Sequence, residues 1–202
     1  MKTTFTFPVD SALAGRSLPQ QRVWDLPVRL FHWLLVLSFA GAWLTADSER
    51  WRLLHVDLGY AMAGLVAFRV VWGLIGSYHA RFANFVRGPA AVLRYLGSVR
   101  AGRPEHHVGH NPAGAIAILL LLCLTVLVVA SGWADFNDLG GDWLATAHEL
   151  LAEAMLGLVA LHLIGVAVAS RQHRENLVLA MITGRKPVRR PQVPADRADP
   201  KV

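Results

Sequence analysis

Four long apolar stretches constrain this chain more than any other feature of its sequence. They occupy about residues 29–46, 55–77, 112–133 and 145–170, and the third contains the run AIAILLLLCLTVLVVA. A helical crossing of a bilayer needs roughly 17 to 25 predominantly apolar residues. Hydrophobic residues make up 54% of the 202 positions, which is more than an ordinary soluble domain carries. The sequence therefore predicts an all-α integral membrane protein, a bundle of four transmembrane helices.

Lys and Arg residues are distributed unevenly among the segments around these stretches. Seventeen of them lie at or before residue 29, between residues 77 and 111, or after residue 170, whereas the two short connections hold only Arg50 and Arg52. Cytoplasmic segments of membrane proteins carry the excess of positive charge, so both the N and the C terminus are predicted to be cytoplasmic. Contact with anionic lipid then accounts for the net charge of +6, and no nucleic-acid partner is expected.

The chain is expected to form one membrane domain at 24–186, flanked by an N-terminal cytoplasmic segment at 1–23 and a disordered, Pro-rich tail at 187–202. The first 23 residues lack an apolar core, which predicts no cleaved signal peptide. Cys123 is the only cysteine. Disulfides, a four-cysteine iron–sulfur cluster and covalent haem attachment through a Cys-x-x-Cys-His motif are therefore excluded.

His148 and His162 stand fourteen positions apart in the fourth stretch. On an α-helix, fourteen residues return to within about 40° of the same face after a rise of about 21 Å. That rise is roughly two thirds of the hydrocarbon core of a bilayer. The spacing therefore predicts two intramembrane sites on one helix face, one near each membrane surface, which suits a pair of cofactors.

Two further intramembrane histidines lie at matching depths on other stretches. In the predicted orientation, His32 lies near the cytoplasmic surface, level with His162, and His55 lies near the outer surface, level with His148. Neutral imidazole is a good ligand of haem iron, and a flat macrocycle fits between the helices of a bundle. The predicted ligand pairs are His32 with His162 and His55 with His148. A proton relay is the alternative, whereas a zinc or copper site would need more ligands than two nitrogens.

Arg69 places a guanidinium inside the second stretch, where an unpaired charge is costly. It follows His55 by fourteen residues, which puts it at the depth of His32 and His162. A haem propionate could bind it through two hydrogen bonds, and the alternative is that it snorkels to lipid headgroups.

Small and aromatic residues add weaker signals. Glycines in the three histidine-bearing stretches would let a planar ring approach the backbone, although they also suit helix packing: Gly41, Gly59, Gly64 and Gly157. Tryptophans near the ends of the stretches are expected to be interfacial anchors: Trp24, Trp51, Trp72, Trp133 and Trp143. The histidines outside the stretches are expected to be ordinary solvated side chains: His79, His106, His107 and His173, with His110 considered below.

Five motifs follow one another along the chain: WDLPVRLFHW at 24–33, HVDLGY at 55–60, FRVVWGLIGSYHARFANF at 68–85, GHNPAG at 109–114 and ENLVLAMITGRK at 175–186. Together they resemble bacterial cytochrome b561 proteins and the b-type cytochrome subunits of nickel–iron hydrogenases. The resemblance covers about residues 23–187. It implies a multi-pass protein of the bacterial inner membrane that holds two non-covalent haem b groups, ligated by the same two histidine pairs.

The resemblance also implies electron transfer between ubiquinone or menaquinone and a periplasmic partner, either a c-type cytochrome or a hydrogenase or dehydrogenase subunit. Whether the chain is an enzyme, as a quinone oxidoreductase, stays open at this point. The family pattern repeats Arg69 and the GHNP sequence around His110. His110 is therefore expected at a propionate or a quinone site, with a plain helix-entry residue as the alternative. Asn111 and Pro112 predict an N-cap and a first helical position.

Two other functions are open to such a chain, a superoxide oxidase that passes electrons to quinone and a haem-free membrane anchor or transporter. The predicted outer loops carry mostly acidic residues, Asp47, Glu49, Asp57, Asp135, Asp138 and Asp142, against Arg50 and Arg52. Such a surface attracts a basic protein and repels anions. The loops therefore favour a basic redox partner over superoxide as the substrate.

Overall fold

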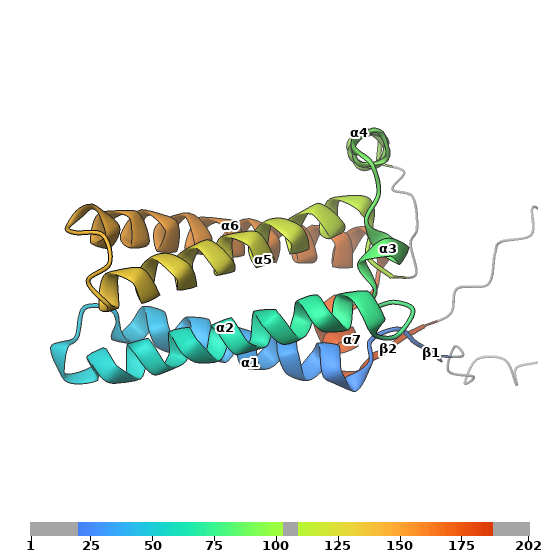
Figure 1. Cartoon of the computed structure of the whole chain (residues 1–202). Helices are drawn as coiled ribbons and strands as arrows, with labels where there is room; N and C mark the ends of the chain where they lie inside the picture. The colour runs from blue at the N-terminus through green and yellow to red at the C-terminus, as the bar shows by residue number, and fades with distance from the viewer. Residues whose placement is uncertain (1–19, 103–108, 188–202) are drawn as a thin grey trace, which may run out of the picture.

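The computed structural model describes residues 20–102 and 109–187, in which four long helices run along a common axis (Figure 1). They are α1 (Leu26–Thr45), α2 (Arg52–Ile75), α5 (Pro112–Phe136) and α6 (Trp143–His173). Each is long and apolar enough to cross a membrane, α2 being counted with the 3-10 turn η2 (Glu49–Trp51) that precedes it. The predicted bundle of four transmembrane helices is confirmed.

Helices α1 and α5 begin where the sequence offers a side-chain cap. The Asp25 carboxylate accepts a hydrogen bond from the backbone N–H of Val28 at 2.9 Å, and α1 therefore starts at Leu26. The Asn111 side chain accepts from Gly114 N–H at 2.7 Å with Pro112 next in the chain, as predicted. Helix α6 extends beyond the predicted stretch at both ends and stops at Arg174, which adopts a left-handed conformation.

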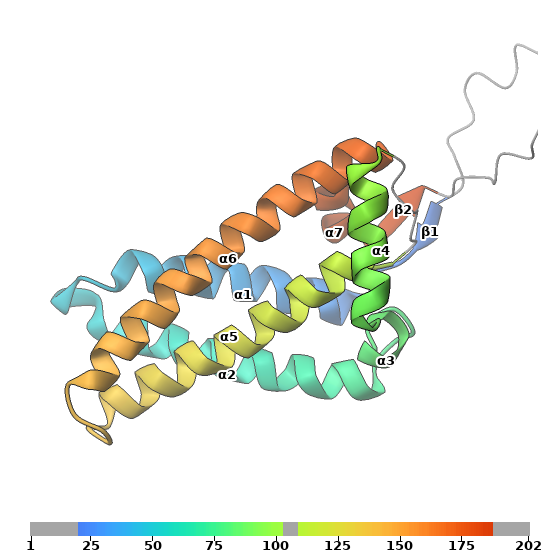
Figure 2. The same cartoon turned by 90° about the horizontal axis from the view of Figure 1, so that it is seen from above.

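Backbone packing joins α1 to α2, α2 to α5 and α5 to α6. The buried side chains of Phe31, Val66 and Leu122 meet where α1, α2 and α5 come together. Helix α6 has 31 residues and runs obliquely across the bundle (Figure 2). Its length of about 46 Å exceeds the hydrocarbon core, so it either tilts or extends beyond the core.

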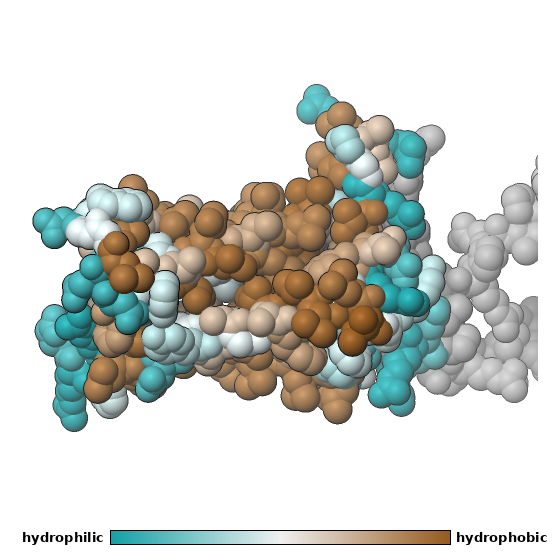
Figure 3. Space-filling view, in the orientation of Figure 1, coloured by the Kyte–Doolittle hydropathy of each residue, from teal (hydrophilic) through white to brown (hydrophobic). Residues whose placement is uncertain are grey.

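The face of the bundle seen in Figure 3 is apolar along its middle and polar at both ends. Large hydrophobic side chains remain exposed along the spans, among them Leu37, Leu74, Leu161 and Leu163. In water such a surface would be costly, whereas lipid tails cover it without penalty. The exposed band is therefore the lipid-facing surface of a multi-pass membrane protein.

The two ends of the bundle differ. The loop end carries the connections 46–48 and 137–142. The terminal end carries two short helices, α3 (Phe82–Phe85) and α7 (Leu177–Thr183), the crosswise helix α4 (Pro89–Arg100), and a pair of strands (Figure 1). Strand β1 (Gln20–Arg22) pairs antiparallel with β2 (Arg185–Pro187). None of these elements was predicted from the sequence. Helices α3 and α7 and the two strands are too short to carry a periodic pattern, whereas α4, with 12 residues, lies in a connection whose Arg residues were used only to predict orientation.

Gly184 connects α7 to the strand pair. Its carbonyl accepts hydrogen bonds from Val23 N–H at 2.9 Å and Trp24 N–H at 3.1 Å. Its φ of +78° is left-handed, and a Cβ at this position would lie 2.6 Å from the Trp24 carbonyl oxygen. The predicted disordered tail begins at Pro187, which is instead the last residue of β2, and the rest of that tail and most of the predicted N-terminal segment lie outside the described residues.

Candidate functional site

His55 and His148 face each other at the loop end of the bundle. His55 lies in the first turn of α2, and His148 lies in the second turn of α6. Their ring centres are 6.1 Å apart, and the ring planes are nearly perpendicular, at 87°. The structure therefore brings together the two histidines that were predicted to share the outer depth.

Both of these rings are oriented by backbone carbonyl groups. His55 Nδ1 lies 2.9 Å from the Ala42 carbonyl oxygen, and His148 Nδ1 lies 3.0 Å from the Val128 carbonyl oxygen. A carbonyl oxygen only accepts, so each Nδ1 carries the hydrogen and each Nε2 keeps a free lone pair. Metal-ligating histidines characteristically donate their other ring N–H to such a group. Both side chains are therefore prepared to ligate through Nε2.

The side of the His148 ring that faces α5 is closely packed. A Cβ at Gly132 would lie 2.7 Å from His148 Cε1, so only glycine leaves room for the ring there. Ser131 Oγ lies 3.2 Å from His148 Nδ1. Within residues 20–102 and 109–187, no group of three or more His, Cys, Asp or Glu side chains could hold a metal ion. A metal bound by this pair would need further donors from a macrocycle, which a porphyrin supplies.

His32 and His162 lie toward the terminal end, on α1 and α6. They are close enough to interact electrostatically, and both side chains are partly buried. Nδ1 of His32 is buried and has no hydrogen-bond partner among the described residues. A buried polar atom without a partner is costly. This pair matches the second predicted pair, although its rings are less tightly oriented than those of His55 and His148.

Arg69 is buried, with 2% of its surface exposed, and its guanidinium carbon lies 4.7 Å from the centre of the Phe82 ring. Its Nη1 is buried without a hydrogen-bond partner among the described residues. The side chain therefore does not snorkel to the surface. A buried guanidinium with a free N–H donor is suited to bind an anion.

Asp25 lies close enough to Arg69 to interact with its charge. It also accepts a hydrogen bond from Trp72 Nε1 at 2.9 Å. Burial raises the pKa of Asp25, but hydrogen bonds from Ser77, Val28 N–H and Trp72, with the charge of Arg69, outweigh it and bring the pKa below its usual value. Asp25 is therefore an anion that partly balances Arg69 and connects the beginning of α1 to the end of α2.

His110 precedes α5 and is stacked between two aromatic rings. Its ring centre lies 4.4 Å from that of Trp24 and 4.5 Å from that of Phe85. Burial lowers the pKa of His110 to about 3, and the positive charges of Arg69 and Lys186 contribute. Its Nδ1 is buried without a hydrogen-bond partner among the described residues. His110 is therefore a neutral imidazole beside Arg69 and His162. A plain helix-entry residue would be solvated, whereas this side chain is buried.

Lys186 and Glu175 form a buried ion pair behind His110, with 3.6 Å between Lys186 Nζ and Glu175 Oε2. Burial lowers the pKa of Lys186, and Glu175 offsets part of that effect. His79 also lies near this cation, and burial followed by the charge of Lys186 lowers its pKa. Glu175 and Lys186 begin and end the motif at 175–186, and His79 lies in the motif at 68–85, but the motifs alone did not indicate that the three side chains meet.

Several sequence expectations need correction. Trp24 is 7% exposed and packs on His110, and Trp72 binds Asp25, so neither is a simple interfacial anchor. A Cβ at Gly41 would lie 2.9 Å from Leu58, which indicates helix packing. By contrast, no atom lies within 4 Å of a Cβ at Gly59, Gly64 or Gly157, so those backbones are open to a planar group or to lipid. His106 and His107 lie outside the described residues.

The chain is similar to a known protein family over most of its length. Residues 23–184 match the family described as prokaryotic cytochrome b561. The chain is similar to a probable Ni/Fe-hydrogenase B-type cytochrome subunit of Rhizobium leguminosarum bv. viciae, with 23% identity covering 81% of this chain and 87% of the relative. The corresponding protein of Azotobacter chroococcum is 28% identical, over 80% of this chain and 86% of its own.

A probable Ni/Fe-hydrogenase 1 B-type cytochrome subunit of Escherichia coli (strain K12) is 24% identical, over 57% of this chain and 60% of its own. No solved structure matches the chain significantly.

Proposed function

This chain belongs to the prokaryotic cytochrome b561 family, and from that premise we propose that it is a di-haem b-type cytochrome of the bacterial inner membrane. In this proposal it carries electrons across the membrane between the quinone pool and a periplasmic redox partner. Membership of the family supports the general function, that of a membrane b-type cytochrome that transfers electrons. The number of haems, their ligands and the partners are the proposal.

The observation that carries the proposal is the geometry of His55 and His148. Imidazole nitrogens bind metals at about 2 Å, so two imidazoles on opposite sides of one metal have ring centres about 6 Å apart. The ring centres of this pair are 6.1 Å apart. Both Nδ1 atoms are already engaged by backbone carbonyl oxygens, which leaves the two Nε2 atoms for the metal. The residues present therefore fit a haem that His55 and His148 would hold.

His32 and His162 would hold the second haem toward the terminal end. The fourteen-residue interval from His148 to His162 corresponds to a rise of about 21 Å along α6. The buried Nδ1 of His32 has no hydrogen-bond partner among the described residues, as expected of a site that is completed only when the haem binds. Haem iron, when bound, supplies one-electron oxidation and reduction.

Arg69 and His110 would bind an anionic part of the terminal-end haem. Each has a buried nitrogen without a hydrogen-bond partner among the described residues, and the two side chains are near enough to interact electrostatically. A propionate can accept from the guanidinium and from a neutral imidazole N–H. Asp25 neutralises part of the Arg69 charge, which limits the attraction. A quinone headgroup is the other candidate for His110, because the aromatic rings of Trp24 and Phe85 flank it.

The loop end carries the surface for a periplasmic partner. Its acidic residues are exposed in the structure: Asp47, Glu49, Asp57, Asp135, Asp138, Asp142 and Glu149. The bias of Lys and Arg toward the terminal end supports placing the loop end outside the cytoplasm. An acidic surface suits a basic c-type cytochrome, and the names of the relatives make a hydrogenase subunit the other candidate partner.

Purified protein tests the proposal through haem stoichiometry combined with a redox titration. We expect two haems per chain, a b-type absorption band after reduction with dithionite, and two separable midpoint potentials. Reduction by added ubiquinol or menaquinol, and reoxidation by a basic cytochrome c, would establish the two partners. One haem per chain, or none, would overturn the di-haem assignment, whereas full haem content without quinol reactivity would overturn only the quinone.

A further inference from the structure

We propose that α4 lies in the plane of the membrane surface and binds the anionic headgroups of one lipid leaflet. This inference concerns a different surface from the haem sites and goes beyond the proposed electron transfer. It needs only that the four long helices span the bilayer, which the fold and the family support.

Helix α4 runs in a different direction from the four spans. The four spans run along the bundle axis, whereas α4 runs across that axis at the terminal end and projects from the side of the bundle (Figures 1 and 2). When the spans cross a bilayer, a helix in this position lies parallel to the membrane surface at about the level of the headgroups. Helices with one apolar and one basic side bind at that level.

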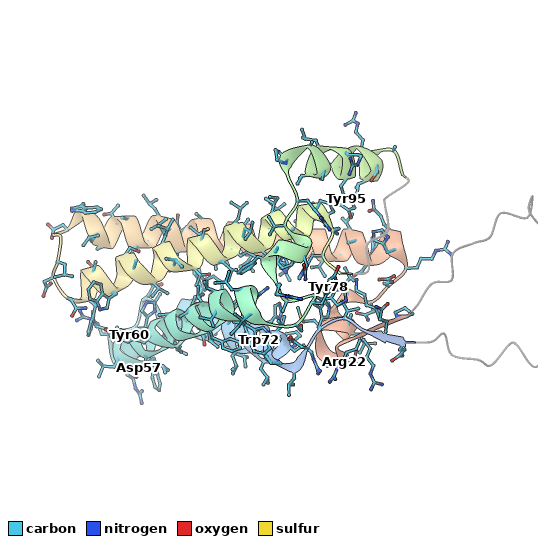
Figure 4. The ribbon with its side chains drawn as sticks, turned by 45° about the vertical axis from the view of Figure 1, so that its right-hand side comes forward. Arg22, Asp57, Tyr60, Trp72, Tyr78 and Tyr95 are labelled. Atoms are coloured by element: carbon cyan, nitrogen blue, oxygen red, sulfur yellow. The ribbon has the colours of Figure 1, made fainter. Side chains whose placement is uncertain are left out.

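One side of α4 is anchored to the rest of the protein. Tyr95 is buried, with 3% of its surface exposed, and points toward the bundle (Figure 4). Its hydroxyl is hydrogen-bonded to Asn111, the residue that caps α5. Burial raises the pKa of Tyr95, and this hydrogen bond partly opposes the shift. The orientation of α4 is therefore fixed by a contact at the entrance of a membrane span.

Two exposed leucines form an apolar edge on α4. Leu93 and Leu96 are 70% and 48% exposed, and as residues three apart they lie on one face, away from Tyr95. Apolar and polar side chains both appear on α4 in Figure 3. In an aqueous position this edge would be an exposed apolar patch, whereas at the membrane surface the acyl boundary covers it.

The segment that contains α4 is positively charged. Arg87, Arg94 and Arg100 are exposed on and just before α4, and the sequence from residue 77 to residue 102 contains no Asp or Glu. Arginine side chains can place their stems along apolar surface while the guanidinium reaches phosphate groups. Because this segment carries positive and no negative side chains, it suits an anionic lipid leaflet better than a protein surface that carries both acidic and basic groups.

Site-directed fluorescence on the haem-loaded protein tests this placement. In a Cys123→Ser background, a polarity-sensitive probe is attached at Leu96→Cys, and in a matched control at Ala101→Cys, which is exposed, follows the last residue of α4 and lies about 140° from Leu96 around the helix axis. In vesicles of phosphatidylcholine and phosphatidylglycerol, we expect lipid-borne quenchers to act on the probe at position 96 and an aqueous quencher to act on the probe at position 101. An unchanged haem spectrum confirms that the variants are folded.

Headgroup selectivity is measured with spin-labelled phosphatidylglycerol against spin-labelled phosphatidylcholine. The anionic lipid should quench the position 96 probe more strongly, and each of Arg87→Gln, Arg94→Gln and Arg100→Gln should reduce the preference, by up to about fivefold per arginine. Equal access of the aqueous quencher to positions 96 and 101 would overturn the placement. Protection from both quenchers would mean that a second protein copy covers α4, and equal quenching by the two lipids would exclude anionic selectivity.

Discussion

The imidazole rings of His55 and His148 lie 6.1 Å apart from centre to centre, and each donates its Nδ1–H to a backbone carbonyl of a neighbouring helix. Ala42 belongs to α1 and Val128 to α5, so α1, α2, α5 and α6 all contribute to this one site. The orientation of both rings is therefore set by the packing of the bundle. A ligand that binds between them would in turn hold the loop ends of the four helices together.

Replacing His148 with Ala should remove the loop-end haem and leave the other one. The remaining imidazole of His55 offers a single axial ligand, which holds a non-covalent haem much less tightly. We expect the haem content to fall from two to one per chain, measured by pyridine haemochrome analysis against protein concentration. His162→Ala should remove the terminal-end haem instead, with a different midpoint potential surviving. His173→Ala is the control, and retention of two haems in either ligand variant would refute the pairing.

A Gly132→Ala substitution tests whether the backbone of α5 holds His148 in place. The added Cβ would lie 2.7 Å from His148 Cε1, so the ring must move and strain or lose its bond to the Val128 carbonyl. We expect partial loss of the loop-end haem and a shift of its absorption band. Gly165→Ala, in open space on α6, should change neither quantity. Identical spectra for the two variants would show that Gly132 does not position the ligand.

The sequence could suggest the histidine pairs because two physical regularities bear on their positions. Helical periodicity places His148 and His162 on one face, and the bias of Lys and Arg assigns a depth to His32 and His55. Neither regularity reports contacts between segments that are distant along the chain. The stacking of Trp24 on His110, the bond from Trp72 to Asp25 and the strand pair depend on such contacts, and all of them lie at the terminal end. Family resemblance singled out His110 and Arg69 but gave no account of their surroundings.

Arg69 should control the potential of the terminal-end haem. A nearby positive charge stabilises the reduced form, so Arg69→Gln should lower that midpoint potential, whereas Arg69→Lys should retain most of it. A charge about 10 Å away at an effective dielectric constant of about 20 contributes about 1–2 kcal/mol, which corresponds to roughly 40–80 mV for one electron. Spectroscopic redox titration measures the shift. A shift of the loop-end haem alone would place Arg69 at the wrong site.

His110 should make the protein less stable as the pH falls. Its pKa is about 3 in the folded protein against 6.5 for the free side chain, so between these values the unfolded state takes up a proton that the folded state does not. Folding stability then falls by up to about 1.4 kcal/mol per pH unit below pH 6.5, and this loss ends near pH 3. Thermal unfolding of wild type and His110→Phe, followed by circular dichroism from pH 7 to pH 5, measures the difference.

In His110→Phe the loss of stability on acidification should be smaller than in the wild type, because the substituted ring can still stack between Trp24 and Phe85 but does not titrate. Haem content should stay at two per chain, since His110 is not assigned as an axial ligand. Parallel stability curves for the two proteins would mean that His110 is protonated in the folded state. A loss of one haem would instead make His110 an iron ligand.

The acidic loop end should make electron transfer to a basic cytochrome c dependent on ionic strength. Its exposed carboxylates, including Asp135, Asp138 and Asp142, attract a cationic partner over a distance that salt shortens from about 30 Å at 0.01 M to about 10 Å at 0.1 M. We expect the second-order rate, measured by stopped-flow oxidation of the reduced protein, to fall steeply with added salt. Neutralising the three residues as Asn should lower the rate at low salt and flatten its salt dependence, whereas Arg52→Gln should raise it. A salt-independent rate in the wild type would remove electrostatic docking as the basis of partner recognition and leave an uncharged contact, as in a permanent subunit interface, to account for it.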